Sequence, residues 1–383
     1  MKYRINPKNG DKLSILGFGC MRFAKSEAEV EKQIISAIES GVNYFDTAYI
    51  YPNSEIILGR VLAKGYRDRV KIATKMPPGN IRKYEDLDKI FNKELERLQT
   101  DHIDYYFMHM MRDVATWSRL VDLGILKWVA EKKEKGQIIN LGFSYHGGKQ
   151  EFINIVDVYD WDFCMIQYNF FDEHHQAGKS GLQYASAKGL PVMVMEPLRG
   201  GKLVTALPKE VYNIWENAYV KRSPAEWAFR WIWNQPEVTV VLSGMNSQEM
   251  IDENIKVASE ADANTFTQKD FDLFDKARDI LSEKIKIPCT GCNYCMPCPS
   301  GVDIPSCFSC YNDREIEGKA GAFMKYIMQT NSHNASLCIK CGKCEQHCPQ
   351  KIEIRQELAK TAKALEPIYY KPIKFVMKNI LKL

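Results

Sequence analysis

The sequence predicts a parallel (β/α)8 barrel followed by a smaller, mainly helical domain that holds metal through cysteines. Eight short apolar stretches alternate with helix-like stretches over roughly 280 residues, which is the size and rhythm of such a barrel. Polar residues suited to proton transfer follow three of these stretches directly. Ten of the twelve cysteines fall between Cys289 and Cys348, which predicts a domain boundary near Ile285 to Pro288.

Composition narrows the class of protein further. The chain has 383 residues, of which 45% are hydrophobic and 26% are charged, as in ordinary globular proteins. Its net charge of +4 is too small to argue for nucleic-acid binding. We find no apolar run typical of a signal peptide or of a membrane span, so we expect a cytoplasmic protein. Cysteines at this density in that compartment favour metal ligation over disulfides.

The expected elements follow the chain in order. Residues Met1 to Ile15 predict a β-hairpin turning at Asn9-Gly10. Apolar residues recur at helical spacing in the expected helices Ser26 to Ser40, Tyr84 to Leu98 and Trp117 to Lys135. The expected strands are Leu16 to Cys20, Asn43 to Phe45, Val70 to Thr74, Ile103 to Met108, Ile138 to Phe143, Phe163 to Gln167, Pro191 to Met195 and Val238 to Leu242. A doubly wound sheet is the alternative, but Leu16 to Arg22 lacks the third glycine of a phosphate-binding loop.

The stretch from Gly41 to Gly59 organises the predicted site. Its strand delivers Asp46 and then Tyr51 to the carboxyl end of the barrel, where such barrels keep their chemistry. A helix is expected to follow, with Ser54 as its N-cap and Glu55 in its first turn.

Two later strands end in residues that complete a proton-transfer site, namely Lys75 and His109. A tyrosine has an unperturbed pKa near ~10 and is therefore a poor acid at neutral pH. A neighbouring ammonium lowers that pKa, and a carboxylate keeps the ammonium charged. A histidine beside the phenol can donate a hydrogen bond to a carbonyl. Together these four side chains suit the protonation of a carbonyl that receives hydride.

Residues 1 to 285 resemble the aldo-keto reductase family. Phe45 to Tyr51 (FDTAYIY) matches its Asp-Thr-Ala-x-x-Tyr motif, and Ala73 to Lys75 and Asp104 to His109 match its lysine and histidine segments. The resemblance implies that Tyr51 is the general acid, that Lys75 and Asp46 tune it, and that His109 orients a small carbonyl or alcohol substrate. A barrel that keeps the four residues only for packing or ion pairing is the alternative.

The cofactor segments match the family less closely. By resemblance, Ser144 and Gln167 would hold a nicotinamide carboxamide, although Tyr145 stands where asparagine is usual. Met195 stands where many relatives place a stacking tyrosine, and Gly244 and Met250 replace cations that grip a 2′-phosphate. The remaining cofactor candidates come from the loops after the seventh and eighth strands: Pro197, Leu198, Gly200, Ser243, Gly244, Asn246, Ser247, Glu253 and Asn254.

Three cofactor readings stay open. The barrel binds NADH, or it binds NADPH through other groups such as Arg199 or Lys202, or it holds a flavin. Loss of the two cations weakens NADP binding, because each would make a charge-assisted contact. Ordinary strand-end polar residues are the plain alternative for Ser144 and Gln167.

The cysteine-rich region contains two runs. The run from Cys338 to Cys348 matches the bacterial ferredoxin pattern C-x2-C-x2-C-x3-C-P, and the run from Cys289 to Cys298 is one residue shorter. By resemblance, the first [4Fe-4S] cluster would take Cys289, Cys292, Cys295 and Cys348, and the second would take Cys338, Cys341, Cys344 and Cys298. Zinc is the rival metal. Cys307 and Cys310 are expected to be free thiols, with a replacement ligand as the alternative.

These features divide the chain into three parts: a barrel over residues 1–285, a ferredoxin-like 2x[4Fe-4S] domain over 286–365 and a basic amphipathic tail over 366–383. In the tail, Lys371, Lys374, Lys378 and Lys382 fall on one helical face, with Ile373, Val376, Met377 and Ile380 largely opposite. We expect this helix to pack on its own protein rather than on a membrane surface.

Two function classes follow. The first is an oxidoreductase of aldo-keto type, whose carbonyl chemistry is coupled to electron transfer through two clusters and an electron-transfer partner protein. The second is a redox sensor or electron-carrier subunit whose barrel serves only for docking. Clusters pass single electrons and a nicotinamide passes hydride, so direct exchange needs a two-electron store. We therefore expect a flavin, in the barrel or in a partner.

Overall fold

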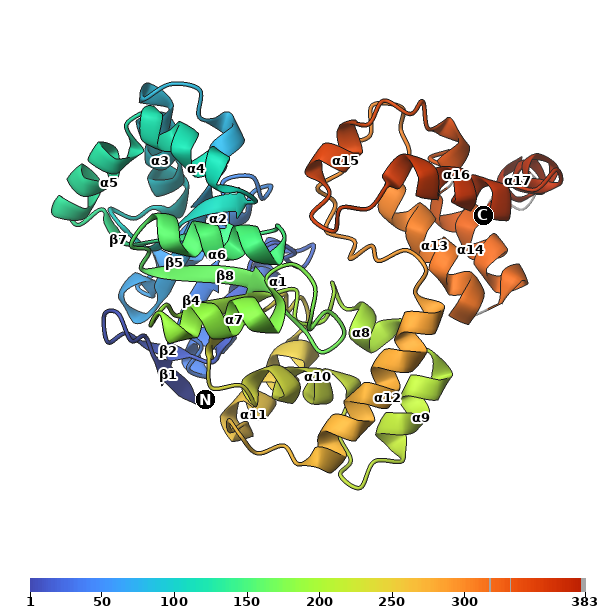
Figure 1. Cartoon of the computed structure of the whole chain (residues 1–383), viewed down its shortest axis with the longest axis horizontal. Helices are drawn as coiled ribbons and strands as arrows, with labels where there is room; N and C mark the ends of the chain where they lie inside the picture. Colours follow the sequence, from blue (N-terminus) through green and yellow to red (C-terminus); the bar gives the residue numbers. More distant parts are fainter. Residues whose placement is uncertain (317, 331, 380–383) are drawn as a thin grey trace. The chain divides into compact units, whose positions relative to one another are not determined.

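The computed structural model describes residues 1–316, 318–330 and 332–379. Eight parallel strands form a closed barrel in the order β10-β3-β4-β5-β6-β7-β8-β9, which confirms the predicted fold class. Figure 1 shows these strands in the blue-to-yellow part of the chain. Their bounds are β3 Leu16–Gly19, β4 Tyr44–Asp46, β5 Lys71–Met76, β6 Ile103–Met111, β7 Ile138–Tyr145, β8 Phe163–Gln167, β9 Val192–Met195 and β10 Val238–Ser243.

An antiparallel hairpin precedes the barrel, as predicted, but its turn differs. Strand β1 (Tyr3–Ile5) pairs with β2 (Lys12–Ser14), and Ile5 lies opposite Lys12. The connection therefore runs from Asn6 to Asp11 rather than through a two-residue Asn9-Gly10 turn. The amide of Gly10 donates to the carbonyl of Asn6 at 2.9 Å, which closes the longer loop.

Helices alternate with the strands. Those grouped with the barrel are α1 Glu27–Glu39, α2 Ser54–Leu62, α3 Glu85–Leu98, α4 Val114–Asp122, α5 Ile125–Glu134, α6 Lys149–Val158, α7 Gly178–Ala187, α10 Pro224–Trp233 and α11 Gln248–Glu260. The predicted helix from Trp117 to Lys135 is in fact two, α4 and α5. Gly124 separates them with a φ of +92°, a left-handed conformation that glycine adopts at little cost.

Strand alternation decides which residues fill the barrel. Side chains two apart on a strand share a face, and the interior core contains Tyr44, Tyr105, Phe107 and Phe163 among others. The rings of Phe107 and Phe163 lie 4.5 Å apart between centroids. The next interior-facing positions toward the carboxyl ends of the strands are Asp46, Lys75, His109, Ser144 and Gln167. Period-two geometry therefore brings the predicted polar residues to one end of the barrel.

The second compact unit comprises Leu198–Pro224 and Gln268–Leu383. Its helices are α8 Lys202–Thr205, α9 Lys209–Glu216, α12 Gln268–Lys284, α13 Ile304–Ile316, α14 Lys319–Thr330, α15 Lys343–His347, α16 Ile354–Leu365 and α17 Tyr370–Asn379. Thus α8, α9 and α12, which the sequence assigned to the barrel domain, group with the cysteine-rich region. The domain bounds at residues 285 and 365 stay predictions.

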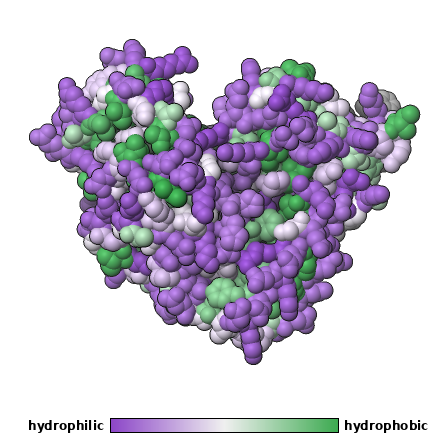
Figure 2. Space-filling model, in the orientation of Figure 1, coloured by the Kyte–Doolittle hydropathy of each residue, from purple (hydrophilic) through white to green (hydrophobic). Residues whose placement is uncertain are grey.

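The tail prediction falls partly outside the described residues. Ile380 and Lys382 are not described, and neither are the side chains of Val376, Met377 and Lys378. Among the helices of the described ranges, none is long and apolar enough to cross a membrane. On the face drawn in Figure 2, hydrophilic residues predominate and apolar residues form small groups.

Candidate active site and cluster sites

A buried ion pair forms the base of the candidate active site. The Lys75 ammonium donates to Asp46 Oδ1 at 2.5 Å and to the carbonyl oxygen of Thr47 at 2.6 Å. Lys75 is 1% exposed and Asp46 is 3% exposed, so the pair is almost entirely removed from water. Burial raises the pKa of Asp46, and the charge of Lys75 opposes that shift. The neighbouring ammonium therefore favours the ionised form of Asp46.

The other two predicted residues lie beside this pair. The Lys75 ammonium lies 5.2 Å from the centroid of the Tyr51 ring, which is half-buried. The rings of Tyr51 and His109 meet edge to face, with 6.0 Å between centroids and 82° between planes. The structure thus brings all four residues of the predicted tetrad together. Their chemical roles stay predictions.

His109 is held in its neutral form. Burial, followed by the charge of Lys75 and the nearby His146, lowers the pKa of His109 well below its ordinary value. A neutral imidazole has one N–H to donate to a substrate oxygen and does not compete with Tyr51 as a strong acid.

His146 is a residue that the sequence reasoning missed. It is 2% exposed, its Nδ1 lies 3.2 Å from Gln176 Oε1, and burial lowers its pKa to about 4. It directly follows Ser144 and Tyr145 at the end of β7, so its place at a strand end was the available signal.

A second buried network supports α2, the helix that follows Tyr51. Glu55 accepts hydrogen bonds from Thr74 Oγ1 at 2.7 Å and from Arg97 at 2.9 Å. The predicted N-cap is wrong: Asn53 takes that position with a φ of +58°, and Ser54 begins the helix. The Ser54 hydroxyl donates instead to the carbonyl of Cys20 at 2.8 Å, because it is buried against the end of β3.

Two cofactor candidates face the same end of the barrel. Ser144 and Gln167 are 1% and 0% exposed. Ser144 Oγ accepts from the amide of Met110 at 2.8 Å, and Gln167 Nε2 donates to Asp172 Oδ2 at 2.7 Å. That donation fixes the amide of Gln167. Its Oε1 is buried without a hydrogen-bond partner among the described residues, so it is open to a donor on a bound molecule.

Tyr145, at the position where asparagine is usual, packs against α6. Its ring packs on Phe152 of α6 at 5.1 Å between centroids, and its hydroxyl donates to the carbonyl of Gly148 at 2.5 Å. Because neighbouring strand residues face opposite ways, Tyr145 lies on the helix-facing side while Ser144 faces the interior.

The loop after β10 has its own internal bonds. Asn254 Nδ2 donates to Ser243 Oγ at 3.1 Å, which ties α11 to the end of β10. Ser247 caps α11, accepting from the amide of Met250 at 3.3 Å. Three further candidates, Gly244, Asn246 and Glu253, lie in this loop and in α11. Their contacts with a cofactor stay predictions.

The remaining candidates divide between the two units. Pro197 belongs to the barrel unit, whereas Leu198 and Gly200 belong to the second. The suggested phosphate-binding cations have other partners: Arg199 donates to the carbonyl of Pro288 at 3.2 Å, and Lys202 donates to that of Cys289 at 3.1 Å. Arg199 is only 1% exposed and its backbone is left-handed, with a φ of +47°. These contacts argue against both as phosphate ligands.

The first cysteine group lines a single pocket. Four thiols line one small pocket, together with apolar residues such as Ile304 and Phe308. They are the four predicted for the first cluster: Cys289, Cys292, Cys295 and Cys348. Burial and then the three neighbouring thiols raise the pKa of the Cys295 thiol. This donor set fits a [4Fe-4S] cluster, which thiolates bind in an apolar shell.

The thiols of the first group do not converge on a site for a single metal ion. Among the residues that the structure describes, no three His, Cys, Asp or Glu side chains are placed to hold a single metal ion. A cubane cluster spreads its four thiolates around four irons.

The second cysteine group lies nearer the surface. Burial, Glu345 and the neighbouring Cys338 raise the pKa of the Cys344 thiol to about 11. Cys341 is exposed, and Cys298 is half-buried with its sulfur 3.3 Å from Ser300 Oγ. Cys338 and Cys344 are therefore neighbours; the assignment of Cys341 and Cys298 to the same cluster stays a prediction.

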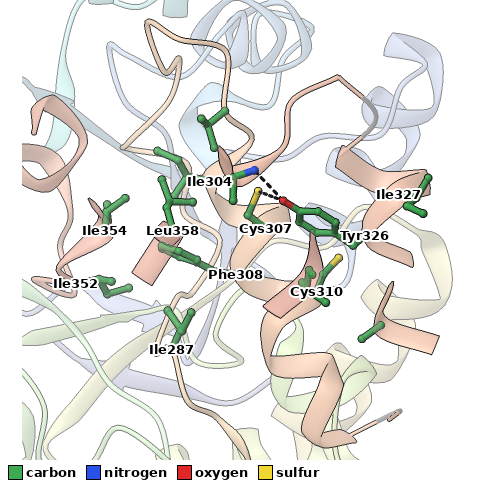
Figure 3. Packing of buried hydrophobic residues seen from close by; sticks show 14 of the residues in the cluster. Ile287, Ile304, Cys307, Phe308, Cys310, Tyr326, Ile327, Ile352, Ile354 and Leu358 are labelled. Atoms are coloured by element: carbon green, nitrogen blue, oxygen red, sulfur yellow. Dashed lines mark hydrogen bonds between the residues drawn. The ribbon is translucent and has the colours of Figure 1, made fainter. Parts of the chain in front are cut away.

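Cys307 and Cys310 lie in an apolar core instead. Both are fully buried on α13, among Ile287, Phe308 and Tyr326 (Figure 3). Cys307 Sγ lies 3.9 Å from the hydroxyl of Tyr326. Neither borders the pocket of the first group. Their surroundings are those of packed thiols.

Comparison with known proteins now defines the class. Residues 15–279 match the aldo/keto reductase family, and residues 288–353 match the 4Fe-4S dicluster domain. The chain therefore belongs to the aldo/keto reductase family and carries a 4Fe-4S dicluster domain with an eight-cysteine pattern, as the sequence predicted. It is an oxidoreductase of that family.

Individual relatives cover the barrel. Protein tas of Escherichia coli K12 is 25% identical over 322 residues, which span 67% of this chain and 92% of that protein. The uncharacterized oxidoreductase YqkF of Bacillus subtilis is 23% identical over 64% of this chain and 88% of its own. The aldo-keto reductase AKR11C1 of Bacillus halodurans, solved in its holo form, has a TM-score of 0.60 at 24% identity. It covers 72% of this chain and 96% of its own, and this likeness concerns the fold alone.

The buried His146 makes stability depend on pH. The folded chain keeps this imidazole neutral down to a pKa of about 4, whereas the unfolded chain protonates it below about 6.5. The unfolded state therefore binds more protons in this window, and stability falls as pH falls. We expect His146→Gln to remove a loss of about 2 kcal/mol between pH 7 and pH 5.

Urea unfolding at both pH values, followed by far-ultraviolet circular dichroism, measures this difference. His174→Gln changes an exposed imidazole in the loop between β8 and α7. It is the matched control and should keep the wild-type dependence of stability on pH. An unchanged dependence in His146→Gln would contradict a buried neutral imidazole.

Proposed function

We propose that the protein is a nicotinamide-dependent carbonyl oxidoreductase that uses NADH and whose two [4Fe-4S] clusters pass electrons to or from a protein partner. The convergence of Asp46, Tyr51, Lys75 and His109 at the carboxyl end of the barrel carries this proposal. The substrate class is a small aldehyde, ketone or alcohol.

The chemistry follows from the charges. When bound, the nicotinamide supplies hydride to the carbonyl carbon of the substrate. The Tyr51 hydroxyl gives its proton to the carbonyl oxygen, so that one hydride and one proton complete the alcohol. The Lys75 ammonium stabilises the phenolate that remains, and Asp46 keeps Lys75 charged. His109 donates its N–H to the carbonyl oxygen and fixes its position.

Interior-facing residues support a nicotinamide at this end of the barrel. The buried Gln167 Oε1 is open to an amide donor, and a carboxamide N–H₂ is such a donor. Met195 pairs with Gln167 across β8 and β9 and faces the same interior. A thioether makes favourable contacts with aromatic rings, which suits it to replace a stacking tyrosine.

The uncharged residues Gly244 and Met250, at the two positions where many relatives place cations, favour NADH over NADPH. Gly244 and Met250 flank the start of α11, and Met250 is 43% exposed. Arg199 and Lys202 are bonded to carbonyl groups instead. A 2′-phosphate would thus find few charge-assisted partners here.

Restoring these cations should change cofactor preference. Gly244 tolerates a side chain, since an added Cβ meets nothing closer than 3.9 Å and its φ is not left-handed. We expect Gly244→Lys/Met250→Arg to lower KM for NADPH by roughly tenfold or more, with little change for NADH. Steady-state assays with both cofactors measure this shift, and Gly244→Gln/Met250→Gln is the uncharged control. Equal KM values for NADPH in the two variants would argue against the phosphate site.

Electron exchange between clusters that carry one electron and a hydride that carries two needs a cofactor able to hold both electrons. We propose that this cofactor is a flavin in a partner protein. An anaerobic ultraviolet-visible spectrum with iron, sulfide and cofactor analysis tests the whole proposal. Two clusters without flavin, together with carbonyl reduction by NADH, support it. A flavin band that copurifies with the chain would shift the barrel cofactor to flavin. Clusters without any carbonyl turnover would favour an electron-carrier subunit.

A further inference from the structure

The two cysteine groups differ in their exposure to solvent. The first lines a pocket whose other walls include the apolar residues Ile304, Phe308 and Ile354. The second lies on an open loop, where Cys341 is exposed and Ile339 between the cysteines is 68% exposed. Electron transfer slows steeply with distance, so the second group is the nearer contact for an external protein.

Positive charge surrounds this exposed loop. Lys340 and Lys343 flank Cys341, Lys351 follows Cys348, and all three lysines are exposed. The amide of Lys351 donates to the carbonyl of Cys348 at 3.2 Å, in a turn that directly follows the last cysteine of the run.

A fourth cation lies over the loop from α16. The Arg355 guanidinium lies near Gly342, where an added Cβ would be 3.7 Å from the guanidinium carbon. Arg355 is bonded to Glu345 at 2.9 Å, so these two charges offset each other. From residue 337 to 355 the chain has four basic and two acidic residues, the second acid being Glu353. The excess charge of this segment is therefore carried by the three lysines.

We propose that this face, which we call the cluster-2 face (Leu337, Ile339, Lys340, Lys343 and Lys351), docks an acidic protein that carries single low-potential electrons. One electron leaves the reduced centre of the carrier, which is thereby oxidised, and reduces the second cluster; no bond forms or breaks. The proposal deepens the proposed function by naming the partner class, and it requires the clusters but not the carbonyl chemistry.

The surface has the composition of a transient electron-transfer interface. An exposed apolar centre, Leu337 and Ile339, excludes water on contact, and a rim of lysines steers an oppositely charged partner. Small interfaces suit such encounters, because the partner must leave after each electron. A membrane surface is less well matched, since the short helix α15 offers no long amphipathic face.

The test measures reduction of the holoprotein by a defined probe. The clusters are mixed anaerobically with a reduced, acidic bacterial 2x[4Fe-4S] ferredoxin, and the second-order rate is followed by stopped-flow absorbance. We expect the wild-type rate to fall with added salt. Lys340→Glu/Lys343→Glu should slow the reaction at least tenfold at low salt and abolish or reverse its salt dependence.

Matched controls distinguish an effect on docking from an effect of net charge and from loss of a cluster. Lys209→Glu/Lys319→Glu makes the same change in net charge at exposed positions on α9 and α14 and should change the rate less than twofold. Iron content and the final extent of reduction by excess dithionite should be wild-type in both variants.

Each outcome decides the proposal. Equal slowing by both double variants, or a salt-independent wild-type rate, would overturn it. The salt dependence is measured on the wild-type protein. It therefore tests the proposal even if a variant loses its iron. Binding of the holoprotein to anionic phosphatidylserine vesicles, lost in Lys340→Glu/Lys343→Glu without any effect on the ferredoxin rate, would assign the face to a membrane and overturn the protein partner.

Discussion

Replacement of Tyr51 by Phe should lower kcat for carbonyl reduction by about 10³-fold while leaving the fold and the iron content unchanged. The substitution removes only the hydroxyl, so the ring keeps its contacts with His109 and with the Lys75 ammonium. The ion pair of Lys75 and Asp46 also remains. The reaction then loses its proton donor but keeps its substrate pocket. Oxidation of NADH in the presence of a small aldehyde measures the effect.

Tyr49→Phe is the matched control for this loss. Tyr49 lies two residues earlier, and its ring stacks on the guanidinium of Arg97 at 4.6 Å. Removal of that hydroxyl should leave kcat within about twofold, since the proposal gives it no role in proton transfer. Full activity in Tyr51→Phe would show that another group is the acid, and equal losses in the two variants would point to a structural effect.

Replacement of Cys348 by Ala should remove one of the two clusters. Iron should fall from about eight to about four atoms per chain, because Cys348 is the one predicted ligand of the first cluster that comes from the second cysteine run. The broad visible absorbance of the clusters should fall by about half. The pocket would lose its cluster, so we also expect the second compact unit to unfold at a lower temperature.

Cys307→Ala provides the comparison. Both cysteines are buried, at 8% and 0% exposed, so both variants create a small cavity in the same core. Iron content in Cys307→Ala should remain at about eight atoms. Iron loss in Cys307→Ala but not in Cys348→Ala would mean that the predicted ligand set is wrong, and zinc in place of iron would contradict the clusters altogether.

Much of this architecture could be predicted from sequence because it depends on short-range periodicity. Each barrel strand alternates interior and exterior residues, so Asp46, Lys75 and His109 were assigned to one end from their strands alone. The two cysteine runs are likewise local, and their spacing alone indicates clusters. The eight predicted strands agree with the observed ones to within a few residues.

Features that depend on long-range packing could not be predicted. Serine is a residue type favoured at N-caps, but burial of Ser54 against Cys20 gives its hydroxyl a different partner. Arg199 and Lys202 were natural candidates for phosphate binding, yet their partners lie 89 and 87 residues away in the chain. His146 belongs to no motif, and only its burial beside His109 makes it notable.

The contacts of Arg199 and Lys202 have a consequence for damage by oxygen. Iron–sulfur cubes are destroyed by oxidants, and the chain around Cys289, a predicted ligand, would then lose the cluster that we expect it to bind. The carbonyl groups of Pro288 and Cys289 would then be able to move away from the side chains of Arg199 and Lys202. The segment after β9 would loosen in turn, so oxidative injury at the iron would open a site for proteolysis almost ninety residues upstream.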